Sequence, residues 1–108
     1  MLFTGVPVSS LESGAGFFER LLGRRADIPV NEGEVMWRLA DAAWLYVVVD
    51  PARCGHGLAA LSVSDLDAAL VELENRGITP EKIEEVGNGR KATVRDPDGN
   101  TVAVIEVP

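Results

Sequence analysis

Cysteine and histidine are nearly missing from this chain of 108 residues, which has one of each, Cys54 and His56. A single cysteine excludes an intramolecular disulfide and any zinc cluster built from several thiolates. It also favours a reducing, cytoplasmic setting. With one histidine and no G-x-S-x-G motif, the chain gives little support to a serine nucleophile activated by a histidine base.

Basic charge and long apolar runs are also scarce. The chain has 10 Lys and Arg against 17 Asp and Glu, a net charge of −7, which argues against nucleic acid or an anionic membrane as partner. The acidic excess is either a solvated surface or a match for a cationic ligand. The apolar stretch Trp44–Val49 is far shorter than the roughly 20 residues of a membrane span. The first ten residues lack the pattern of a signal peptide.

The composition, 46% hydrophobic and 25% charged, predicts one soluble globular domain over residues 1–108. An internal repeat divides it, because VSSLE at residues 8–12 returns as VSDLD at residues 63–67. Ser9 with Glu12, and Ser64 with Asp67, have the Ser-x-x-acid spacing that caps a helix N-terminus. Apolar residues then follow at helical spacing in both copies: Leu11, Ala15, Phe18 and Leu22, and Leu66, Ala69, Leu70 and Leu73.

Strand patterns surround both predicted helices, and DPDGN at residues 96–100 has strong turn chemistry. Residues 79–86 fit either a strand or a helix. The pattern predicts an α+β fold in which a strand, a helix and then two or three strands occur twice, in modules of residues 1–53 and 54–108 joined through the loop at 51–57. The expected strands are Leu2–Val8, Val35–Ala40, Trp44–Val49, Leu58–Val63, Arg90–Arg95 and Thr101–Val107.

This doubled βαβββ order, with V-S-x-L opening each helix and DPDGN before the last strand, resembles the vicinal oxygen chelate superfamily. That group includes glyoxalase I, bleomycin-resistance proteins and extradiol dioxygenases. The resemblance covers essentially the whole chain. It implies two modules whose curved mixed sheets form a cleft, usually in a homodimer.

In metal-dependent members of that superfamily, His, Gln or Glu ligands come from the first and last strands of each module. The resemblance places three of these positions at Phe3, Leu58 and Ala103, and the fourth within Trp44–Val49, which has no carboxylate or imidazole. We therefore expect neither a metal nor another cofactor. Two residues remain as displaced ligands, His56 near Leu58, and Glu106, whose spacing from Ala103 puts it on the opposite face.

An apolar cleft is the remaining candidate site. Phe3, Leu58 and Ala103 would form its floor, and aromatic rings would form its walls, although each ring serves equally well in the core or at a dimer interface. Trp44 and Tyr46 lie on one face of their strand, with Leu45 and Val47 on the other. Arg90, which precedes the DPDGN turn, is either a ligand contact or a solvated side chain, and Arg38 is a weaker candidate. The predicted ligand-binding residues are Phe3, Trp37, Trp44, Tyr46, Leu58, Arg90 and Ala103.

These observations favour a metal-free protein, similar to bleomycin-resistance proteins, that sequesters a small aromatic or cationic compound. The expected partners are that ligand and a second copy of the chain. An antibiotic-resistance role is what the resemblance implies. Two alternatives remain: a glyoxalase-type or dioxygenase-type metalloenzyme with displaced ligands, and a vestigial domain that only dimerises or regulates.

Overall fold

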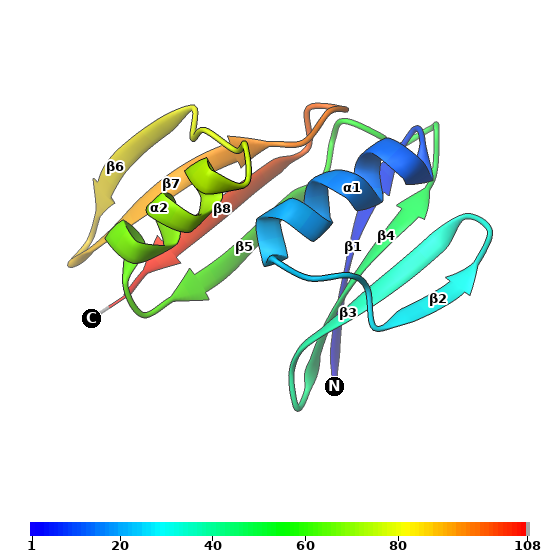
Figure 1. Cartoon of the computed structure of the whole chain (residues 1–108), viewed down its shortest axis with the longest axis horizontal. Coiled ribbons are helices and arrows are strands. Elements are labelled where there is room, and N and C mark those ends of the chain that lie inside the picture. Colours follow the sequence, from blue (N-terminus) through cyan, green and yellow to red (C-terminus); the bar gives the residue numbers. More distant parts are fainter. Residues whose placement is uncertain (108) are drawn as a thin grey trace.

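Two halves of the chain form the same βαβββ arrangement in a computed structural model, which describes residues 1–107 (Figure 1). This confirms the predicted fold class. The first half contains β1 (Leu2–Val8), α1 (Leu11–Leu22), β2 (Ile28–Asn31), β3 (Glu34–Ala40) and β4 (Ala43–Val49). The second half contains β5 (Leu58–Val63), α2 (Leu66–Asn75), β6 (Lys82–Val86), β7 (Gly89–Arg95) and β8 (Thr101–Glu106). No helix within residues 1–107 is long and apolar enough to cross a bilayer.

Each half forms one four-stranded mixed sheet with the same strand order. Sheet A has the order β1-β4-β3-β2, and sheet B has the order β5-β8-β7-β6. In both, the first strand pairs in parallel with the last, and the other pairs are antiparallel. The ambiguous residues 79–86 contribute a strand over Lys82–Val86. The sequence prediction missed β2, a four-residue edge strand whose residues are all exposed and give no hydrophobic period.

Both helices begin one residue later than the Ser-x-x-acid spacing predicts. The capping side chains are Ser10, which accepts from the Ser13 N–H, and Asp65, which accepts from the Ala68 N–H. The predicted pairs Ser9 with Glu12 and Ser64 with Asp67 are therefore wrong as capping boxes. Neighbouring positions in both repeats carry side chains able to cap, so spacing alone did not distinguish them.

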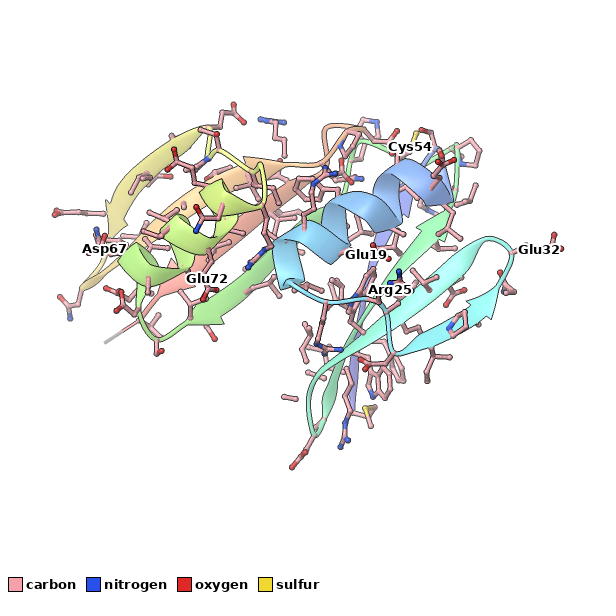
Figure 2. The ribbon with its side chains drawn as sticks, viewed as in Figure 1. Glu19, Arg25, Glu32, Cys54, Asp67 and Glu72 are labelled. Carbon is pink, nitrogen blue, oxygen red and sulfur yellow. The ribbon has the colours of Figure 1, made fainter. Side chains whose placement is uncertain are left out.

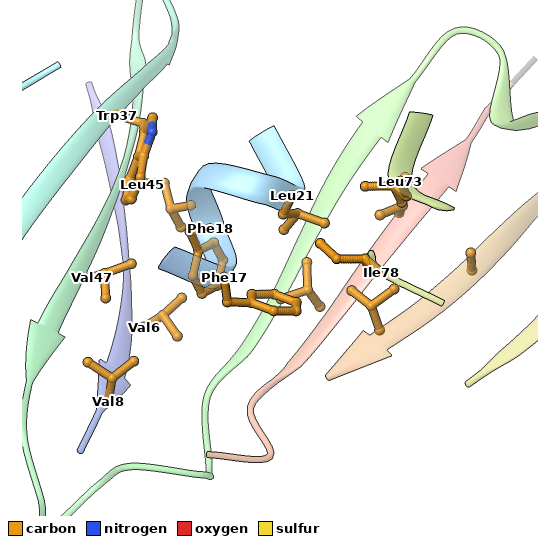
Figure 3. Packing of buried hydrophobic residues seen from close by; sticks show 14 of the residues in the cluster. Val6, Val8, Phe17, Phe18, Leu21, Trp37, Leu45, Val47, Leu73 and Ile78 are labelled. Carbon is orange, nitrogen blue, oxygen red and sulfur yellow. The ribbon is translucent and has the colours of Figure 1, made fainter. Parts of the chain in front are cut away.

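One hydrophobic core joins the halves, with α1 at its centre (Figure 3). Phe18 of α1 is fully buried against sheet A and lies 6.3 Å from Trp37 of β3, between ring centroids. On the other flank of α1, Phe17 and Leu21 point toward Leu73 of α2 and Ile78, which follows it. Since α1 packs against both halves, burial of its apolar side chains stabilises the whole domain.

Each helix covers one face of its own sheet and leaves the other face uncovered. The covered faces belong to the common core, which contains Val6, Val8, Leu45 and Val47 from sheet A and Ala92, Val94, Val102 and Val104 from sheet B. We call the opposite faces the open faces of sheets A and B. Because both covered faces turn toward the same core, the two open faces of a single chain do not enclose a cleft between them.

The predicted DPDGN turn joins β7 to β8 and also clamps the two halves together. Asn100 is fully buried, and its amide NH₂ donates to the Pro7 carbonyl at the end of β1, 2.7 Å away, and to the Asp96 carboxylate, also 2.7 Å away. Its Oδ1 accepts from the Gly57 N–H at 2.6 Å. A Cβ on Gly57 would lie 2.7 Å from that oxygen, so a glycine is needed there. Asp98 in the same turn accepts from the Ser9 N–H, just before α1.

We predict that Asn100→Ala lowers the free energy of unfolding by about 2–4 kcal/mol, because it leaves buried polar groups of both halves without partners. Urea unfolding followed by circular dichroism measures this change. Asn88→Ala, in the exposed β6–β7 turn, is the matched control and should cost less than about 0.5 kcal/mol. Equal unfolding midpoints for the two variants would contradict the role of Asn100 in joining the two halves.

Candidate functional site

The open face of sheet A carries aromatic and large apolar side chains in rows across the strands. Strand register places Phe3, Trp44 and Arg38 in one row and Gly5, Tyr46, Met36 and Ile28 in the next. Phe3 is 54% exposed, and Trp44 and Tyr46 are half-buried. The predicted alternation of Trp44 and Tyr46 against Leu45 and Val47 is confirmed, since the last two are buried in the core.

Tyr46 lies flat across β1 because its neighbour there is a glycine. A Cβ built on Gly5 would come within 2.3 Å of Tyr46 Cζ, so any side chain at residue 5 would displace the ring. The missing side chain at Gly5 therefore leaves the space that the phenol occupies. The result is an aromatic surface level with the strands, suited to stacking against a planar molecule.

The open face of sheet B carries mostly small side chains near its free edge. Ala60 of β5 pairs with Ala103 of β8, and Leu58 pairs with Thr101. Leu58 is 79% exposed and Ala103 is half-buried. This face thus has no aromatic ring among the paired residues of its strands, and its large apolar side chains include Leu58 and the half-buried Ile105.

The fourth position equivalent to a superfamily metal ligand is Tyr46. Alignment of the modules pairs Phe3 with Leu58, and the strand registers then pair Tyr46 with Ala103. Phe3, Tyr46, Leu58 and Ala103 offer no imidazole or carboxylate, so this set of side chains does not fit a divalent metal. Nowhere in residues 1–107 do three or more His, Cys, Asp or Glu side chains gather in a way that could hold a metal ion.

The two displaced ligands considered from the sequence lie apart. His56 is exposed in the loop between the halves. Glu106 lies on the covered side of sheet B, as its spacing predicted, where its carboxylate accepts from the Leu66 N–H at 2.7 Å and caps α2. It also lies 3.8 Å from Arg90, so its surroundings are those of a structural carboxylate.

Two of the predicted site residues lie away from the open faces. Trp37 is 0% exposed and donates its indole N–H to the Arg24 carbonyl, so it belongs to the core, and its assignment to a ligand-facing wall is corrected. Arg90 pairs across β7 and β8 with Glu106, on the covered side, and lies 3.2 Å from Asp67 of α2. The expectation that Arg90 borders the site therefore does not match its position, since α2 holds it on the other face.

Arg38, the weaker candidate, lies on the open face beside Trp44, and its backbone is held by a loop. The Asp27 carboxylate accepts from the Arg38 N–H at 2.6 Å, and Arg24 donates to the Arg38 carbonyl. Arg24 also lies 2.8 Å from Asp27, and these hydrogen bonds lower the pKa of Asp27 below its ordinary value. The hydrogen bond that the Arg38 N–H donates to the Asp27 carboxylate is thus present at neutral pH and is lost only as acid protonates Asp27.

Among the hollows along the seam between the halves, two have a mainly apolar lining. The larger, about 480 Å³, is formed by α1, α2 and β5 and is lined mainly by aliphatic residues such as Leu21, Leu61 and Leu73. The smaller, about 230 Å³, lies between the free edges of β1 and β5 and brings Trp44 together with Leu58. This hollow thus brings together two of the predicted site residues.

Two βαβββ modules, each with one helix-covered and one open sheet face, define a class of small α+β proteins. The chain belongs to the Glyoxalase/Bleomycin resistance protein/Dioxygenase superfamily, whose family profile matches residues 2–104. No protein of curated function matches the chain.

Solved structures with the same fold include a glyoxalase/bleomycin resistance protein from Catenulispora acidiphila. It is 38% identical with a TM-score of 0.93, and the match covers 99% of this chain and 97% of that one. TnmS3, an antibiotic binding protein from Streptomyces sp. CB03234, is 25% identical with a TM-score of 0.78, over 98% and 93% of the two chains. The bleomycin-binding protein of Streptomyces verticillus, in complex with copper(II)-bleomycin, is 20% identical with a TM-score of 0.79, over 99% and 95%.

The two tryptophans should differ sharply in solvent access. We predict that acrylamide quenches a distinct fraction of the intrinsic fluorescence and that Trp44→Phe removes this fraction, because Trp37 is sealed in the core. Stern–Volmer plots of the wild type and of Trp44→Phe measure the effect. Unchanged quenching in Trp44→Phe would contradict the assignment of Trp44 to an open surface.

Proposed function

We propose that the protein binds a small planar aromatic compound by stoichiometric capture, without a metal. The observation that carries this proposal is the open face of sheet A, where Phe3, Trp44 and Tyr46 present rings beside the hollow that Trp44 shares with Leu58. Stacking on such rings and removal of apolar surface from water supply affinity without a reaction. The ligand would lie on this face and extend toward β5.

Structures with this fold support the proposal. They include one protein described as antibiotic binding and several described as bleomycin-binding or as a bleomycin resistance determinant. These likenesses support the further proposal of a role in resistance to a small toxic compound. The single cysteine favours a cytoplasmic setting for that role. The glyoxalase-type alternative finds no support at Phe3, Tyr46, Leu58 and Ala103, which lack the donor atoms that such chemistry requires.

A second copy of the chain completes the site in this proposal. Among the strands of residues 1–107, β1 and β5 each have one unpaired outer edge. Apolar residues are exposed along these edges, namely Leu2 at 60%, Phe3 at 54% and Leu58 at 79%. Free strand edges with exposed apolar groups favour pairing with another chain. The open face of sheet A in one copy would then face that of sheet B in the other, giving two equivalent clefts.

Ligand capture is tested by titration calorimetry with bleomycin, an anthraquinone and 2-naphthamide. We predict saturable binding of at least one compound at one molecule per chain, and about tenfold weaker binding in Trp44→Ala, because a stacked ring is lost. Val71→Ala, an exposed apolar position on α2, is the matched control and should bind as the wild type does. Absence of heat for every planar compound, or equal loss in both variants, would overturn the proposal.

The dimer is tested by light scattering coupled to gel filtration. We predict twice the chain mass of 11.5 kDa for the wild type and a monomer for Leu58→Glu, because a buried carboxylate at the interface is costly. Val71→Glu adds the same charge on α2 and should remain dimeric. A monomeric wild type at high micromolar concentration would contradict the two-chain cleft.

A further inference from the structure

The charge of the open faces differs from that of the rest of the chain. Strand register assigns to them four of the ten basic side chains, Arg38, Lys82, Lys91 and Arg95, but only two of the 17 acidic ones, Glu34 and Glu84. The open faces thus carry +2, whereas the remaining residues carry −9. Even with Asp41 and Glu81, which flank the strands and pair with Arg38 and Arg95, the open faces are neutral.

The acidic excess lies on helices and turns. Glu19 projects from α1, Asp67 and Glu72 project from α2, and Glu32 lies at the β2–β3 turn (Figure 2). These carboxylates point away from the open faces or lie beyond them. The net charge of −7 therefore does not describe the surface that a ligand would meet, and it gives no reason to expect a cationic ligand there.

On the open face of sheet A, Arg38 is the basic side chain next to the aromatic rings. It pairs directly with Trp44 across β3 and β4, and neighbouring strands lie about 4.8 Å apart. A β-bulge between Arg38 and Ala40 ends the regular register at this point. The Asp27 and Arg24 contacts hold the Arg38 backbone, while its side chain is 53% exposed.

The present partner of the Arg38 side chain is weak. Its guanidinium donates to the Asp41 carboxylate at 3.3 Å, and the Asp41 side chain is fully exposed in the β3–β4 turn. Exposed pairs of this kind contribute little to stability. An anion bound over Trp44 would therefore displace Asp41 at little cost, and would gain a charge-assisted, bidentate contact with the guanidinium.

We propose that the ligand of this protein is an aromatic acid, whose ring stacks on Trp44 and whose carboxylate or other anionic group pairs with Arg38. This inference rests on the proposed function and narrows its ligand class from planar aromatic compounds to aromatic compounds that carry an anionic group. Arg38 acts as the specificity-determining residue, and Asp41 competes with the ligand for it.

Three naphthalene probes of equal ring size test the inference by titration calorimetry: 2-naphthoate, 2-naphthamide and 2-naphthylmethylammonium. We expect the acid to bind about tenfold more tightly than the amide, and the amine to bind most weakly. Arg38→Gln should abolish the preference for the acid without changing the affinity for the amide. Asp41→Asn should tighten binding of the acid two- to fivefold, because it removes the competing carboxylate.

Arg53→Gln is the matched control, since Arg53 also forms an exposed i,i+3 pair, with Asp50, but in the loop between the halves. It removes the same charge and should leave all three affinities unchanged. Equal binding of acid and amide, a preference for the amine, or the same loss in Arg53→Gln as in Arg38→Gln would overturn the anionic ligand while leaving capture of an aromatic ring intact. Absence of binding by all three probes would overturn capture itself.

Discussion

The buried amide of Asn100 is the constraint on which the arrangement of the two halves depends. It ties the last strand pair of sheet B to the end of β1 and to the loop before β5, and it uses both donors and its acceptor to do so. An amide at this depth is stabilising only while all its partners are in place, so it selects one arrangement of the halves. That arrangement places α1 at the centre of the common core and leaves the far face of each sheet open.

Elements with a strong hydrophobic period were predictable from the sequence, and those without one were not. The repeat at Val8 and Val63 located both helices, because the same motif precedes the same apolar face. The short edge strand β2 was not predicted, since its exposed residues show no hydrophobic period. The capping residues were displaced by one position because Ser10 and Asp65 are as capable of capping as the neighbouring Ser9 and Ser64. The DPDGN turn was predicted, but its contact with Pro7 depends on tertiary packing.

The site was predictable in its faces but not in every residue. Alternation placed Trp44 and Tyr46 together correctly, because period two holds along any regular strand. Trp37 and Arg90 were misplaced since the sequence does not reveal which face of their strands a helix will cover. Arg38 was only a weaker candidate from the sequence. The strand register, which pairs it with Trp44, is what places it beside the aromatic rings. Nothing in the sequence indicated that the missing side chain at Gly5 makes room for the ring of Tyr46.

One measurement tests the central claim, that an aromatic ligand binds on the open face of sheet A. The indole N–H groups of Trp37 and Trp44 give two separate signals in a ¹⁵N-correlated NMR spectrum, and 2-naphthoate is titrated into the labelled protein. If the ligand stacks there, the Trp44 signal shifts progressively and saturates, while that of Trp37, whose indole N–H donates to the Arg24 carbonyl, stays in place. Binding that leaves the Trp44 signal unmoved while residues of the seam such as Leu21 and Leu73 shift would contradict it.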